Sequence, residues 1–248
     1  MENRFLLALL GLFLALPAVA ADEVLQRTLK ISPSGSLVLF NINGPVEVEG
    51  WDRSEVDLYA VKSSNAHPED LSRVQIDVQA SADRITVRTE YPQDEGIEVT
   101  VSYRVRVPRH LHLEQLATVN GLVRVRGVEG AGELRTVNGN VELLDSSGQF
   151  SGKTTNGNVR FELRHVDSTG AMTMETVNGS VLLAVPLGAG FDVDARSMNG
   201  SFYSELPVAI LGAEDPQGFR GRVGRGGATV RVRTVNGGIR VVTTRPSA

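Results

Sequence analysis

The chain has 248 residues, of which 26 are glycine and 5% are aromatic, and it contains no cysteine. This length is enough for one large or two modest domains with a substantial core, and the glycine-rich, valine-rich composition favours stacked β-structure over helices. The absence of cysteine excludes disulfide bonds, thiolate chemistry and lipoprotein acylation, and the net charge of −4 alone indicates no class of partner.

The first twenty residues have the pattern of a signal peptide. Arg4 precedes an apolar run at residues 5–16, which is shorter than the roughly 20 residues that span a bilayer. Ala18 and Ala20 suit a signal peptidase. We therefore predict that residues 1–20 are removed and that the mature protein is exported to the periplasm or to the cell surface and exterior. An uncleaved anchor over residues 5–21 is the alternative.

Residues 21–115 are predicted to form strands without a regular repeat. Alternating or β-branched segments at 37–40, 46–48, 56–60, 74–78, 85–87 and 97–107 carry this prediction. The polar segment 63–70 lies between them as a loop, and no linker separates this region from the rest of the chain. We expect a sheet that continues into the following residues and caps one end of them.

The C-terminal half repeats a hydroxyl-x-Asn-Gly motif six times, with a seventh, outlying copy at 41–44. The glycines of the six copies are 18, 18, 22, 21 and 37 residues apart, so the last gap is close to two periods and a degenerate turn is expected at Gln217-Gly218. Strand alternation follows each copy, as in Val123 and Val125 against Arg124 and Arg126. The repeated pairs are Asn120 and Gly121, Asn138 and Gly139, Asn156 and Gly157, Asn178 and Gly179, Asn199 and Gly200, and Asn236 and Gly237.

These Asn-Gly pairs are interpreted as structural corners. Both residues tolerate positive φ, and the asparagine side chain can bond to backbone groups at a tight turn. Stacking at about 4.8 Å would align the asparagines in a ladder and the hydroxyls in a second one. A ligand surface on the asparagine row, or separate hairpins at each corner, are the alternatives.

The repeat predicts an all-β fold, specifically a β-solenoid: a parallel β-helix-like stack of rungs of about 20 residues with an N-terminal β-sheet cap. We accordingly divide the chain into a signal peptide at 1–20, the N-terminal strand region at 21–115 and the Asn-Gly repeat at 116–245.

Charge is unevenly distributed along the chain. Residues 41–102 contain 13 acidic and 5 basic side chains, whereas residues 216–248 contain seven arginines and no acidic residue. A solvated surface explains such sorting, and a basic face for an anionic partner is the functional alternative. The predicted ligand-binding face consists of Arg220, Arg222, Arg225, Arg231, Arg233 and Arg240.

No local pattern indicates an active site. Asp192 and Asp194 share a strand face at a spacing near that of an inverting glycosidase, but Glu47 and Glu49 repeat this spacing on an ordinary charged strand. The histidines, at 67, 110, 112 and 165, lack a third metal ligand in their vicinity. The glycine- and arginine-rich segment 220–227 lacks the context of a phosphate loop or an RNA-binding box. We predict no catalytic residues, metal, cofactor or nucleic-acid partner.

Several segments resemble the bacterial putative-adhesin family, also called toast-rack proteins. The segments are 40–52, the strand at 103–108, the serial Thr-Val-Asn-Gly corners, and the closing segments 204–208 and 226–231. The resemblance covers nearly the whole mature chain and implies a β-solenoid-like envelope or surface protein with no family catalytic residues.

The leading functional hypothesis is a non-enzymatic envelope protein that binds or scaffolds an anionic envelope polymer or another envelope protein. A polysaccharide lyase or hydrolase on a β-helix is one alternative. Self-assembly through the open strand edges at the solenoid ends is the other.

Overall fold

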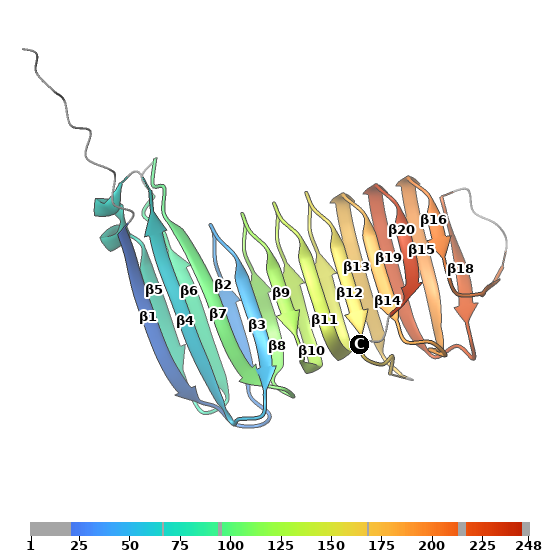
Figure 1. Cartoon of the computed structure of the whole chain (residues 1–248), viewed down its shortest axis with the longest axis horizontal. Coiled ribbons are helices and arrows are strands. Elements are labelled where there is room, and N and C mark those ends of the chain that lie inside the picture. Colours follow the sequence, from blue (N-terminus) through green and yellow to red (C-terminus); the bar gives the residue numbers. More distant parts are fainter. Residues whose placement is uncertain (1–20, 66, 94–95, 168, 213–216, 245–248) are drawn as a thin grey trace, which may run out of the picture.

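The computed structural model describes residues 21–65, 67–93, 96–167, 169–212 and 217–244. It confirms the all-β class: these residues form twenty strands and one short 3-10 helix, η1 (Pro68–Arg73). The strands lie side by side along the long axis of the molecule (Figure 1). None of the described helices is long and apolar enough to cross a membrane. The predicted signal peptide, 1–20, lies outside the described residues.

The strands belong to two sheets, which we call sheet A and sheet B, and β11 (Val141–Lys153) passes from the first to the second. In spatial order, the other strands of sheet A are β1 (Ala21–Lys30), β4 (Glu55–Ser64), β7 (Thr100–Pro108), β3 (Val46–Trp51), β9 (Val123–Arg126), then β12 (Val159–Leu163), β14 (Val181–Val185), β20 (Ile239–Thr243) and β16 (Phe202–Ser204). Those of sheet B are β5 (Gln75–Ala80), β6 (Arg84–Glu90), β2 (Ser36–Phe40), β8 (His112–Ala117), β10 (Glu129–Arg135), then β13 (Ala171–Asn178), β19 (Ala228–Asn236), β15 (Phe191–Asn199), β18 (Gly218–Val223) and β17 (Val208–Ile210).

Each rung in the middle of the molecule contains one strand of sheet B, an Asn-Gly corner and one strand of sheet A. Strands of successive rungs pair in parallel, so equivalent residues stack in columns. One such column on the inner face of sheet A is Val123, Val141, Val159, Val181 and Ile239. All five side chains are buried. The strand alternation in the sequence therefore builds a continuous apolar core between the two sheets.

The rungs do not stack in chain order at either end. The rung of β19 and β20 lies between the rung of β13 and β14 and the rung of β15 and β16. Likewise, β2 and β3 lie between β6 and β7 on one side and β8 and β9 on the other. The insertion of β19 and β20 explains the long gap before Gly237.

The turn expected at Gln217-Gly218 therefore does not belong to the row of corners. Instead, Gly218 begins β18, which runs antiparallel to β15 and covers its outer edge. With β17 it forms an antiparallel end to sheet B. The Phe219 ring meets Phe202 edge to face, with 4.3 Å between the ring centroids, and so closes the core at this end.

The opposite end is closed by η1 and the buried side chain of Lys62. Its Nζ donates to the carbonyl oxygens of Leu71, at 2.8 Å, and Val74, at 3.0 Å. The same Nζ lies 2.8 Å from Glu23 Oε2 on the edge strand β1. A buried ammonium is costly unless it is paired and hydrogen-bonded, and these three partners supply that compensation while joining β1, β4 and η1.

Candidate functional site

The Asn-Gly corners form a ladder of seven side chains. Beyond the first asparagine, each Nδ2 donates to the Oδ1 of the neighbour on the N-terminal side of the stack, at 2.8 to 2.9 Å. The spatial order is Asn43, Asn120, Asn138, Asn156, Asn178, Asn236 and Asn199, so the outlying copy of the motif joins the row. The side-chain amides hydrogen-bond to one another, which agrees with a structural role for these asparagines.

The corner hydroxyls bond to the backbone instead of to one another. For example, Thr154 Oγ1 donates to the carbonyl oxygen of Gly139 in the preceding rung at 2.9 Å, and Ser197 Oγ does the same to Gly237 at 3.0 Å. In the first copy, Asn41 takes the place of the hydroxyl, and its Nδ2 donates to the carbonyl oxygen of Val101 on the neighbouring strand β7 at 2.8 Å.

The corner glycines are required mainly because the rungs approach closely. A Cβ added at Gly179 would overlap the carbonyl oxygen of Gly157, although Gly179 does not have a left-handed φ. The corner asparagines have negative φ, since Asp145 is the one non-glycine residue with positive φ in the described parts of the chain. The positive-φ argument drawn from the sequence is therefore wrong for the asparagines and for Gly179, but it holds for Gly44, Gly139, Gly157 and Gly237, whose φ values lie between +119° and +156°.

The six arginines of the predicted ligand-binding face do not share one surface. Arg220, Arg222, Arg231 and Arg233 lie on the outer face of sheet B. Arg240 lies on sheet A, where its guanidinium is 5.6 Å from the ring centroid of Tyr203. Arg225 follows β18 in a turn.

Carboxylates compensate much of the charge on sheet B. Arg222 donates to both oxygens of Asp192, at 2.8 and 3.2 Å. Asp194 lies between Arg196, Arg220 and Arg231, at 3.7, 3.9 and 4.0 Å. The hydrogen bond from Arg222 lowers the pKa of Asp192, so this carboxyl is poorly suited to be the proton donor of a glycosidase.

Three of the histidines line a shallow pocket on sheet B together with Glu129 and Asp167. His110 Nδ1 is 3.3 Å from the carbonyl oxygen of Glu129, and His165 Nε2 is 3.2 Å from Asp167 Oδ1. Within the part of the chain that the structure describes, no three such side chains are placed to share a metal ion.

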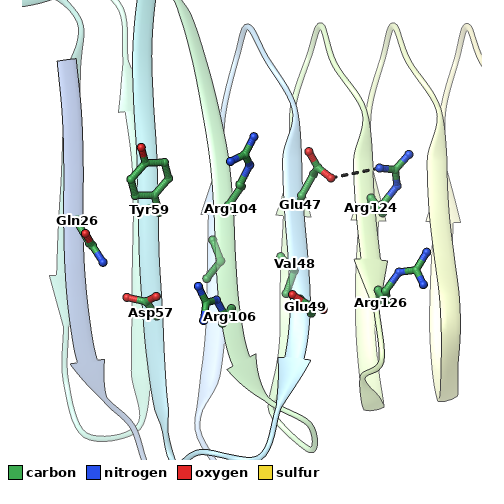
Figure 2. A pocket seen from close by; sticks show the side chains of 11 residues that line it. Gln26, Glu47, Val48, Glu49, Asp57, Tyr59, Arg104, Arg106, Arg124 and Arg126 are labelled. Carbon is green, nitrogen blue, oxygen red and sulfur yellow. Dashed lines mark hydrogen bonds and ion pairs between the residues drawn. The ribbon is translucent and has the colours of Figure 1, made fainter. Parts of the chain in front are cut away.

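A groove of about 580 Å³ lies on the outer face of sheet A, which β1, β4, β7, β3 and β9 form (Figure 2). Its charged residues alternate because of the strand register. Arg104 lies between Tyr59 and Glu47, and Glu47 in turn lies between Arg104 and Arg124. The neighbouring row is Asp57, Arg106, Glu49 and Arg126. Four arginines thus face three carboxylates, with the polar side chains of Gln26 and Tyr59 at one side.

The four guanidinium groups are not equally engaged. Arg124 is bound by Glu142 at 2.8 Å and Glu47 at 3.2 Å, and these carboxylates raise its pKa. Arg106 lies 5.4 Å from the ring centroid of Trp51. Among the described residues, Arg104 and Arg126 make no ion pair or hydrogen bond through their guanidinium groups, so both can bind an incoming anion.

Sequence reasoning missed this groove. The Val-Arg alternation at 123–126 and 103–108 was visible, but it indicated only a solvated strand face. The acidic excess of residues 41–102 is offset here by arginines of β7 and β9, which no sequence-local count of charge reveals. The feature that identifies the groove is the pairing of β3, which carries glutamates, with arginine-bearing strands on both of its sides.

No known family model matches the chain, nor does any curated protein sequence. Solved structures with similar arrangements include a "putative cell adhesion protein" from Clostridium sporogenes, 12% identical, covering 90% of this chain and 100% of its own, with a TM-score of 0.48. A "putative adhesin" from Bacteroides fragilis is 11% identical, with 88% and 97% coverage and a TM-score of 0.41. A "Putative lipid binding protein" from Parabacteroides distasonis is 10% identical, with 90% and 97% coverage and a TM-score of 0.23. Similarity this low carries no argument about function, but two of these descriptions match the adhesin family that the sequence resembles.

Proposed function

We propose that this chain is a non-catalytic, exported protein of the bacterial cell envelope, built as a β-solenoid, that binds an anionic envelope polymer in the groove of sheet A. The parallel, columnar pairing of the rungs supports the solenoid description, and the N-terminal sequence supports export. The observation that carries the binding proposal is that two guanidinium groups, Arg104 and Arg126, make no ion pair with a described residue inside a groove that also holds carboxylates and a tyrosine.

The chemistry of the groove fits an acidic polysaccharide. Guanidinium groups bind carboxylates and phosphates through paired hydrogen bonds. The acceptors Glu47, Glu49 and Asp57 can take hydrogen bonds from sugar hydroxyls, and Tyr59 offers an apolar ring with a polar tip. The groove is open on the sheet face, so a linear polymer can lie across several strands.

The outer face of sheet B is the weaker candidate for the same ligand. Its Arg222 is already hydrogen-bonded to both oxygens of Asp192, and Arg220 lies 3.9 Å from Asp194. These ion pairs also weaken the alternative of a polysaccharide-active enzyme, because both carboxylates are held by arginines.

Affinity electrophoresis through gels containing polygalacturonate tests the proposal, with neutral dextran as the control polymer. We expect retention of the wild type that decreases with added salt, since exposed charges are screened over about 8 Å at physiological ionic strength. Substituting Arg104 and Arg126 by serine should abolish retention, whereas substituting Arg220 and Arg231 should not.

Retention that depends on the second pair of arginines instead would place the site on sheet B. Shortening of the polymer by the wild-type protein would overturn the non-catalytic assignment. Retention on neutral dextran as strong as on polygalacturonate would show that the guanidinium groups do not select the ligand.

A further inference from the structure

All hydrogen bonds of the asparagine ladder run in the same direction, and the last acceptor, Asn199 Oδ1, has no donor among the described residues. Asn199 Nδ2 donates to Asn236 Oδ1 at 2.8 Å. In every earlier rung the Oδ1 accepts from the following rung, but no described residue donates to Asn199 Oδ1. The other end is not open in this way, because β7 continues the stack beyond Asn43, where the Val101 N–H donates to the Asn43 carbonyl at 2.8 Å.

Backbone N–H and carbonyl groups at this terminal corner also point away from the stack. Gly237 N–H donates to the Asn199 carbonyl at 3.1 Å, and Ile239 N–H donates to the Ser201 carbonyl at 2.9 Å. By the same alternation, the N–H groups of Gly200 and Phe202 face away from the stack. No described hydroxyl donates to the Gly200 carbonyl, although the equivalent carbonyl of each inner rung accepts one.

The opening is confined to the corner and to sheet A. On sheet B, β18 covers the outer edge of β15, and the Ser197 N–H donates to the Gln217 carbonyl at 2.9 Å, so the place beyond Ser197 is already filled. On sheet A, β16 pairs only with β20 in the described part of the chain, so its outer edge is open. Two large side chains beside this edge are unusually exposed, Met198 at 61% and Tyr203 at 52%.

A cavity of about 190 Å³ lies at the open corner, with Ser197, Gly200, Phe202 and Phe219 among its lining residues. Cavities of about 150 Å³ can hold a benzene molecule, so this one has room for an aliphatic side chain. In the inner rungs, the residue two positions after the corner glycine is buried and branched, as in Val141, Val159, Val181 and Ile239. An added strand with the same pattern would direct such a residue toward this cavity.

We propose that the C-terminal corner and β16 bind an extended segment of a partner polypeptide with the pattern Asn-Gly-x-Val or Asn-Gly-x-Ile, which adds one more strand beside sheet A. The partner asparagine Nδ2 donates to Asn199 Oδ1. The partner backbone accepts from the N–H groups of Gly200 and Phe202. Strand addition of this kind gains affinity from the main chain and specificity from side-chain pockets. It is independent of the groove on sheet A.

The probe is a synthetic peptide with the sequence of residues 236–243 of this chain, which begins with Asn-Gly-Gly-Ile. Binding to the full mature protein is followed by fluorescence anisotropy of the labelled peptide. We expect saturable binding that is weakened at least tenfold when the peptide asparagine is replaced by aspartate, which lacks the Nδ2 donor. A scrambled peptide should not bind.

Two variants of the protein locate the binding. Ser204→Pro removes an N–H on the open side of β16, a position where an edge strand tolerates proline, and it should abolish peptide binding without lowering the melting temperature of the unliganded protein by more than a few degrees. Ser204→Ala keeps the N–H and should bind the peptide as the wild type does.

Peptide binding that survives Ser204→Pro would overturn the proposal, because the peptide would then bind by replacing a strand of an inner rung and not by adding to the edge of β16. So would a concentration-dependent dimer that Ser204→Pro dissociates, because the edge would then be occupied by a second copy. Equal affinity for the asparagine and aspartate peptides would remove the role of the ladder.

Discussion

Asn236 Nδ2 donates to Asn178 Oδ1 at 2.8 Å, although 58 residues separate them along the chain. Asn236 in turn accepts from Asn199 at 2.8 Å. The last rung of the sequence is therefore an inner rung of the stack. In a solenoid built in chain order, the last rung would contact a single neighbour and could be lost with local effects only.

Deleting residues 228–248 should consequently unfold the C-terminal part of the stack. The deletion leaves β13 and β15 of sheet B, and β14 and β16 of sheet A, without the strands between them. Thermal melts followed by circular dichroism should no longer show a single cooperative transition. The control is deletion of residues 21–30, since β1 pairs only with β4 among the described strands and should be lost at smaller cost. A cooperative melt of the C-terminal deletion within a few degrees of the wild type would contradict the rung order.

Thr154→Val should destabilise the protein by about 1 kcal/mol, the usual net value of a hydrogen bond. The substitution keeps the shape of the side chain but leaves the Gly139 carbonyl without its buried hydroxyl donor. Thr155→Val is a matched control at the adjacent, exposed position, where other copies of the motif have valine. Urea unfolding gives both free energies, and equal effects would show that the corner hydroxyl has no special role.

Gly179→Ala and Gly188→Ala separate two reasons for having glycine. Alanine at 179 would overlap the Gly157 carbonyl without an unfavourable φ, and should cost more than about 2 kcal/mol by forcing the rungs apart. Alanine at 188 has φ of +87° but nothing within 4 Å, and should cost about 1 kcal/mol. Chemical denaturation measures both, and the reverse order would reject close approach as the dominant requirement.

Stability should decrease as the pH rises from 10 to 12. Burial raises the pKa of Tyr103 to about 12 from its ordinary value of 10.0. Above pH 10 the unfolded chain loses this proton while the folded chain keeps it, so ionisation favours unfolding, by about 2 to 3 kcal/mol near pH 12. Urea melts at pH 9 and pH 11.5 should show a smaller loss for Tyr103→Phe than for the wild type.

The exposed Tyr203 provides the control for this measurement, because Tyr203→Phe should follow the wild-type pH dependence. Tyr91, whose pKa burial also raises to about 12, remains in both variants and leaves some residual slope. Identical slopes for wild type and Tyr103→Phe would contradict the burial of Tyr103 beside Thr89, whose hydroxyl lies 2.7 Å from the phenol oxygen.

The sequence predicted those features that depend on local pattern. The Thr-x-Asn-Gly copies and the Val alternation around Arg124 predicted the all-β class and pointed to the asparagine row. The rung order was not predictable, because the place of β19 depends on end contacts such as Phe202 with Phe219. The groove was missed because Glu47 and Arg124 are 77 residues apart and become neighbours only through the insertion of β3 between β7 and β9.

Arginine footprinting tests the central claim most directly. A protein of residues 21–248 is treated with phenylglyoxal with and without polygalacturonate, and modification of each arginine is quantified by peptide mass spectrometry. Binding in the groove predicts that the polymer protects Arg104 and Arg126 while Arg220 and Arg231 are modified equally in both samples. Protection of Arg220 and Arg231 with no change at Arg104 and Arg126 would contradict it.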